Sequence, residues 1–218
     1  PRAVFRGGVY RLASYSADWR RRGVKRTSVN KDNCRSVGRT ALLRSRESAT
    51  RRAALDLHLS GFDGWERKLR VGDETMRRMD APQSLPMEEQ IRKFRYAVNA
   101  EGHGGWADRL YQLLLSPQLV LAQDLPARLW YEQLLAPGVT HLSVDSNFGN
   151  LSAVVRWARA HPREVEAMVA SANRAADLAT SLRGARAYVS ELLRRYAELQ
   201  QRSYRPRRHW RAVRFACR

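Results

Sequence analysis

Cysteine is scarce in this chain, and so are the patterns that identify the commonest metal and membrane proteins. The 218 residues include two cysteines, Cys34 and Cys217, too few for a disulfide framework or a set of zinc ligands. None of the five histidines forms a pair at ligand spacing on one helix. The longest apolar runs stay below 18 residues, so the sequence predicts no transmembrane helix.

Three familiar enzyme motifs are missing as well. The chain has no G-x-G-x-x-G dinucleotide fingerprint, no P-loop with its Gly-Lys-Ser/Thr ending, and no G-x-S-x-G nucleophile elbow. These absences argue against the usual dinucleotide-binding enzymes, P-loop nucleotidases and α/β-hydrolases. A nucleotide site in this chain must be built in another way.

Acidic residues are few at the two ends of the chain, whereas basic residues are frequent there. The whole excess of positive charge therefore lies at the two ends. The net charge is +19, of which residues 1–52 carry +12 and residues 202–218 carry +7. We therefore predict a folded domain over residues 1–201 with a basic loop at 17–35, followed by a basic, disordered tail at 202–218. Charge confined to the ends does not favour nucleic acid as the main partner.

Hydrophobic residues make up 44% of the chain, enough to bury a core, and their spacing alternates between strand and helix patterns. Expected helices are at 37–46, 107–115 and 129–135, and the chain turns wholly helical from residue 150, with breaks at His161-Pro162 and Gly184. Strands are expected at residues 3–10, 53–59, 94–98, 118–122 and 139–144. Residues 61–86 are expected to form a long loop. This order predicts an α/β fold with a mostly parallel sheet and a helical C-terminal end.

Two glycine turns follow predicted strands, and each has an arginine beside it. The carboxyl ends of parallel strands meet at one sheet edge, where ligands bind. Arginine guanidiniums and glycine amides at such an edge suit a diphosphate. The alternative is that the turns only redirect the chain and that the arginines are solvated. The candidate residues are Arg6, Gly7, Gly8, Arg39, Gly102, Gly104, Gly105 and Arg109.

Four passages, in the same order, resemble motifs of glycosyltransferase family 90, which includes protein O-glucosyltransferases and capsule-associated xylosyltransferases. They are residues 5–8 (FRGG), 93–99 (KFRYAVN), 102–115 (GHGGWADRLYQLLL) and 130–139 (WYEQLLAPGV). The resemblance extends over residues 3–200. It implies a GT-B fold with two Rossmann-like halves, of which this chain is the C-terminal, donor-binding half.

The resemblance also implies a reaction and a set of contacts. Arg6, Arg39 and Arg109, with the amides of Gly7, Gly8 and residues 102–105, would contact the diphosphate of a UDP-sugar. No metal or other cofactor is expected. The enzyme would transfer glucose or xylose, with inversion, to a hydroxyl of a protein or glycan acceptor.

The family's catalytic base lies in the N-terminal half, so the resemblance leaves the catalytic residue of this chain unassigned. The chain starts at Pro1 and enters a strand at once, so we expect it to be a piece of a longer protein whose N-terminal half is its partner. The resemblance implies the lumen of the endoplasmic reticulum or Golgi. A basic protein that binds nucleic acid or assembles through an α/β scaffold remains the alternative, and its binding would fall steeply with salt.

Overall fold

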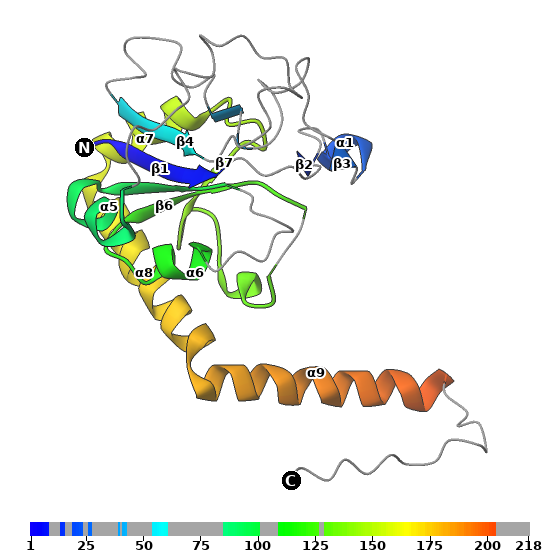
Figure 1. Cartoon of the computed structure of the whole chain (residues 1–218). Coiled ribbons are helices and arrows are strands. Elements are labelled where there is room, and N and C mark those ends of the chain that lie inside the picture. The colour runs from blue at the N-terminus through cyan, green and yellow to red at the C-terminus, as the bar shows by residue number, and fades with distance from the viewer. Residues whose placement is uncertain are drawn as a thin grey trace. The chain divides into compact units, whose positions relative to one another are not determined.

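The computed structural model describes residues 1–8, 14–15, 19–23, 26–27, 39, 41–42, 54–60, 85–100, 109–126 and 129–203 (Figure 1). The chain divides into two compact units, Pro1–Asp177 and Leu178–Arg218. The domain bounds at residues 1–201 and 202–218 stay a prediction. No helix of the described part is long and apolar enough to cross a membrane.

Five parallel strands form the main sheet of the first unit (Figure 1). The strand order is β4 (Leu55–Ser60), β1 (Ala3–Gly8), β5 (Tyr96–Asn99), β6 (Leu119–Gln123) and β7 (Leu142–Val144). The expected α/β, Rossmann-like fold with a parallel sheet is thus confirmed. A separate antiparallel pair joins β2 (Ser14–Tyr15) to β3 (Arg26–Thr27), on either side of the short helix α1 (Trp19–Arg22).

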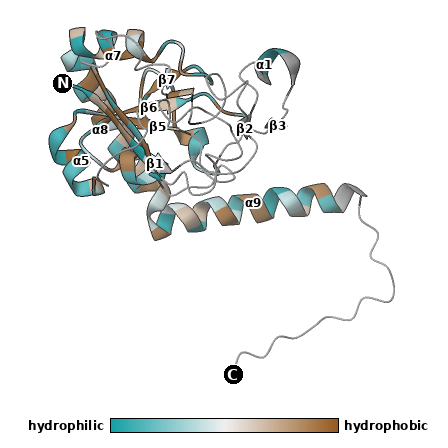
Figure 2. Cartoon of the chain, turned by 45° about the horizontal axis from the view of Figure 1, so that its top comes forward, coloured by the Kyte–Doolittle hydropathy of each residue, from teal (hydrophilic) through white to brown (hydrophobic). Residues whose placement is uncertain are grey.

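Alternation along the strands decides which side chains enter the core. Ala3 lies beside Leu55 on one side and Tyr96 on the other, and Phe5 lies beside Leu57. All five are buried in one hydrophobic cluster, because residues paired across parallel strands share a face of the sheet. Figure 2 shows the strands of this sheet largely in the brown of hydrophobic residues.

Helices cover both faces of the sheet. In Figure 1, α5 (Met87–Lys93) and α6 (Arg109–Leu114) lie on one side and α7 (Leu151–Ala160) on the other, and Figure 2 again shows α5 and α7 on opposite sides. The 3-10 helix η2 (Glu132–Leu134) lies between β6 and β7 in sequence. After α7 the chain breaks at His161, and Pro162 opens α8 (Pro162–Thr180). Proline suits that first helical position because its fixed φ is helical and its missing N–H has no partner there anyway.

The second unit contains α9 (Leu182–Ser203). The sequence placed a break at Gly184, but the break is at Ser181, and Gly184 lies in the first turn of α9. A Cβ at Gly184 would stand 1.8 Å from the main-chain oxygen of Leu178, so only glycine fits this tight approach. The helix expected at 37–46 and the loop expected at 61–86 lie mostly outside the described residues.

Candidate functional site

The strand order creates a point at the sheet edge where two neighbouring strands separate. β1 pairs with β4 along its whole length, from Ala3 to Gly8, but with β5 only through Ala3 and Val4. The chain moves outward from β1 to β4 and then returns past β1 to β5. In open α/β sheets, ligands bind outside the carboxyl ends of the strands at such a switch point.

Two arginines contact one aromatic ring beside this point. The Cζ of Arg109 lies 4.9 Å from the centroid of the Phe5 ring, and the Cζ of Arg39 lies 5.6 Å from it. Both distances are in the range of a cation–π contact. The structure therefore brings together two of the three arginines that the sequence singled out, although they are far apart in the chain.

Gly7 makes room for this arrangement. A Cβ at Gly7 would lie 2.9 Å from Cζ of Phe5 and 3.2 Å from Nη1 of Arg39. The first distance is a steric overlap and the second is very tight. Since Phe5 is fully buried, its ring has little room to move away. Gly7 thus serves here by lacking a side chain, not by an unusual backbone angle.

The Arg109 side chain is held by strand β1 and helix α5. Its Nη1 donates to the main-chain oxygen of Arg6, two residues beyond the last β1 residue that pairs with β5, and its Nη2 lies 3.5 Å from Oε1 of Gln90 in α5. The helix that carries it is anchored in turn by Asn173 of α8. Nδ2 of Asn173 donates to the main-chain oxygens of Leu114 and Ser116, at 2.5 and 3.0 Å.

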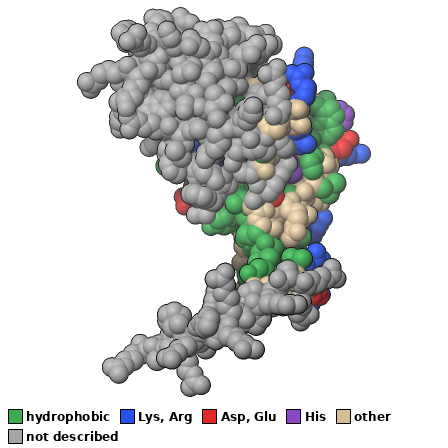
Figure 3. All heavy atoms as spheres, turned by 90° about the vertical axis from the view of Figure 1, so that its right-hand side faces the viewer, with side chains coloured by type: hydrophobic (Ala, Val, Ile, Leu, Met, Phe, Trp, Pro, Cys, Tyr) green, Lys and Arg blue, Asp and Glu red, His purple; other side chains and the backbone are tan. Residues whose placement is uncertain are grey.

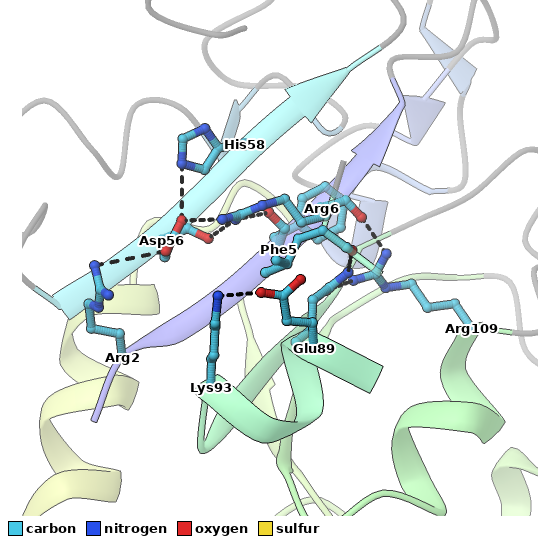
Figure 4. Close-up of polar contacts among 10 residues, drawn as sticks. Arg2, Phe5, Arg6, Asp56, His58, Glu89, Lys93 and Arg109 are labelled. Atoms are coloured by element: carbon cyan, nitrogen blue, oxygen red, sulfur yellow. Dashed lines mark hydrogen bonds and ion pairs between the residues drawn. The ribbon is translucent and has the colours of Figure 1, made fainter. Parts of the chain in front are cut away.

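The Arg6 side chain lies on the opposite face of β1 from Phe5 and Gly7 (Figure 4). Its Nη2 donates to Oδ1 of Asp56 at 2.6 Å and its Nη1 to the main-chain oxygen of Asp56 at 2.7 Å. Nε2 of His58 lies 3.0 Å from the same Oδ1. The structure thus does not bring the Arg6 side chain to Arg39 and Arg109, and its diphosphate contact stays a prediction.

The remaining predicted site residues are glycines. Gly8 ends β1 in register with Ser60 of β4, at the carboxyl edge of the sheet. Gly102, Gly104 and Gly105 lie outside the described residues. Their contacts with a ligand stay predictions.

A pocket of about 480 Å³ lies against the neighbouring strands, and the sequence did not indicate it. Its floor is a row of three register neighbours, Asn99 of β5, Ala122 of β6 and Ser143 of β7. Leu110, which follows Arg109 in α6, forms part of its wall. Figure 3 looks at the side to which the β1 arrow points in Figure 1. Its described part carries hydrophobic side chains among basic, acidic and histidine ones.

An ion pair marks the rim of this pocket. Arg20 donates from Nε and Nη2 to the two carboxylate oxygens of Asp124, at 2.6 and 2.7 Å. Hydrogen bonding to Asp124 and its charge raise the pKa of Arg20, so this arginine stays charged throughout the physiological range. In the described ranges no three His, Cys, Asp or Glu side chains gather closely enough to hold a metal ion.

The chain matches the sequence model of the family described as glycosyl transferase family 90 over residues 23–218. The match includes Arg39, Arg109 and all the residues that line the pocket except Arg20, whereas β1 with Arg6, Gly7 and Gly8 precedes it. No curated protein gives a match to the chain.

Proposed function

The chain belongs to glycosyl transferase family 90, and from this premise we propose that it binds the UDP-sugar donor of a glycosyl transfer reaction. Membership supports glycosyl transfer as the chemistry. The proposal adds that the chain is the C-terminal, donor-binding half of a GT-B enzyme and that the sugar is glucose or xylose.

The observation that carries the proposal is the pair of guanidiniums at the Phe5 ring. Arg39 and Arg109 each place Cζ within 5.6 Å of that ring's centroid, beside the point where β1 and β5 separate. Each guanidinium carries a permanent positive charge and presents several N–H donors, so two of them beside one ring suit an anion with more than one negative charge. A diphosphate supplies such charges and accepts several N–H donors at once.

The two arginines would act mainly on the leaving group. In the proposed inverting reaction, an acceptor hydroxyl attacks the anomeric carbon as the bond from that carbon to the diphosphate oxygen breaks. Negative charge develops on that oxygen, and guanidiniums already in place stabilise it. We extend the proposal to a donor site without a metal or other cofactor, in which Arg39 and Arg109 provide this charge.

The rest of the reaction is assigned to groups outside this chain. A base in the N-terminal half would accept the proton of the acceptor hydroxyl, carried by a protein or a glycan. The lumen of the endoplasmic reticulum or Golgi is the proposed location. Both follow from the family resemblance and are testable only with the longer protein.

Calorimetric titration of the full chain with UDP tests the donor site. We expect Arg109→Ala to weaken UDP binding by about 10- to 100-fold, since a hydrogen bond between charged groups contributes about 1.5–3 kcal/mol. The matched control is Arg95→Ala, because Arg95 is an exposed arginine that pairs with Glu166, away from the Phe5 ring. The proposal fails if the wild-type chain does not bind UDP, or if both variants bind UDP equally well.

A further inference from the structure

The pocket beside the switch point has a floor made of small and polar residues. Asn99 lies in register with Ala122, and Ala122 with Ser143, so the three side chains share one face of the sheet. Two small residues in this row leave the space that a larger side chain would fill. The volume of about 480 Å³ is within the range of small-molecule pockets, about 300–1,000 Å³.

An aromatic side chain forms one wall. Trp130 lines the pocket and stays 37% exposed. Its ring packs edge-on against Tyr131, with the centroids 5.7 Å apart and the planes at 88°. Because Tyr131 is buried, this contact fixes the orientation of the indole. An aromatic face carries partial negative charge and attracts C–H groups of partial positive charge, such as those on one face of a pyranose.

Two carboxylates complete the lining. Asp124 is positioned by both donors of Arg20, and Oε1 of Glu132 accepts from the main-chain N–H of Leu129 at 3.0 Å. A carboxylate accepts up to about four hydrogen bonds, so a positioned carboxylate can still bind hydroxyl groups. Carboxylates, an amide and an indole in the lining of one pocket are complementary to a ring that bears several hydroxyls.

From these residues we propose that the pocket holds a sugar ring, stacked on Trp130 and hydrogen-bonded through its hydroxyls to Glu132, Asp124 and Asn99. The pocket adjoins the proposed diphosphate site, because Leu110 in its wall follows Arg109 in α6 and Asn99 ends the strand next to β1. The identity of the ring rests on the proposed function: it is the sugar of the donor or a sugar of a glycan acceptor.

Binding measurements on the full chain distinguish these sources. The probes are UDP, UDP-glucose and, at saturating UDP, methyl β-glucoside. The variants are Trp130→Ala and Glu132→Gln. The controls are Trp157→Ala, since Trp157 has the same 37% exposure and stacks on His161 outside the pocket, and Glu166→Gln, since Glu166 pairs with Arg95 on the surface. Thermal unfolding of each variant verifies that it folds.

If the pocket holds the donor sugar, the wild type binds UDP-glucose about tenfold more tightly than UDP. Both pocket variants then lose this preference for UDP-glucose, while their affinity for UDP stays within about twofold of the wild-type affinity. If it holds an acceptor sugar, the preference survives and methyl β-glucoside binds the variants about five- to tenfold more weakly. The inference is overturned if neither pocket variant changes either measurement, or if the controls change them equally. If the wild type does not bind UDP, the proposed function is refuted instead, and a titration with methyl β-glucoside in the absence of UDP still tests the pocket.

Discussion

Arg109 donates a hydrogen bond to the main-chain oxygen of Arg6, a residue 103 positions earlier in the chain (Figure 4). This contact joins the first residue of α6 to β1 at the place where β5 has moved away from β1. It therefore fixes a guanidinium at the switch point before any ligand arrives. Side chains positioned in advance bind an anion without the cost of ordering them.

We predict that Gly7→Ala damages this site through crowding. The added methyl would stand 2.9 Å from the Phe5 ring and 3.2 Å from Nη1 of Arg39. Overpacking of this kind costs about 1–3 kcal/mol of unfolding free energy. Displacement of Arg39 should also weaken UDP binding by about tenfold, as expected when a charged hydrogen bond of about 1.5–3 kcal/mol is disturbed.

Gly23→Ala separates the two effects of Gly7→Ala. Gly23 has a φ of +80°, which strains any other residue, but a Cβ there meets nothing within 4 Å. Denaturant unfolding should show a loss of about 1–2 kcal/mol for this variant, while calorimetry finds UDP affinity unchanged. An equal loss of UDP affinity in both variants would mean that Gly7 has no special role at the site.

The Arg6–Asp56 ion pair is predicted to act on stability rather than on donor binding. Their side chains are 15% and 14% exposed, so removing one partner leaves a poorly solvated charge. Asp56→Ala should lower the unfolding free energy by about 2–4 kcal/mol, less than the loss for a fully buried pair because some solvent remains. The double variant Arg6→Met, Asp56→Leu should recover part of this loss, since neither charge is then left alone.

Calorimetry on the same variants decides the role of Arg6. UDP affinity within about twofold of wild type is expected. The Arg6 side chain is bound to Asp56 on the face of β1 opposite to Phe5, whose ring Arg39 and Arg109 contact, and a charge there acts through solvent. A loss as large as that of Arg109→Ala would restore Arg6 as a diphosphate ligand, the role that the sequence predicted.

Glu191 in α9 should titrate far below other carboxyls. Hydrogen bonds from Arg194 and Arg195 lower its pKa from 4.5 to about 2. A lowered pKa means that the interaction stabilises α9 fully above pH 4.5 and is lost as the pH falls toward 2. NMR titration of the side-chain carboxyl should give a pKa near 2, and the double variant Arg194→Ala, Arg195→Ala should return it toward 4.5. A wild-type value of 4.5 would show that the ion pairs do not persist in solution.

The fold class was predictable because each strand carries its own local pattern. Alternating apolar residues at 53–59 and short apolar runs at 3–5 and 119–122 placed strands close to β4, β1 and β6, and proline and glycine marked several of their ends. Four ordered motifs then identified the family, which the match over residues 23–218 confirms. Arg39 and Arg109 were expected at one sheet edge and both lie at the Phe5 ring, while their contact with a diphosphate stays a prediction.

Register and loop shape were not predictable in the same way. The pairing of β1 with β4 places Arg6 beside His58 and near Asp56, and no pattern within β1 reveals which strand will be its neighbour. The polar residues alternating with leucines at 56 and 58 were the one available signal. The pocket at Trp130 depends on the row of Asn99, Ala122 and Ser143, three residues that only the assembled sheet brings side by side.

The place of β1 between β4 and β5 in the sheet also affects how the protein is made. β1 is synthesised before the other strands, yet its partners are Leu55–Ser60 and Tyr96–Ala97. At about 5–20 residues per second, the ribosome needs several seconds to deliver them. During that interval Val4 and Phe5, which end fully buried, have no sheet to join. The nascent chain therefore exposes an apolar segment before its partner strands exist, and such a segment favours aggregation until the sheet is complete.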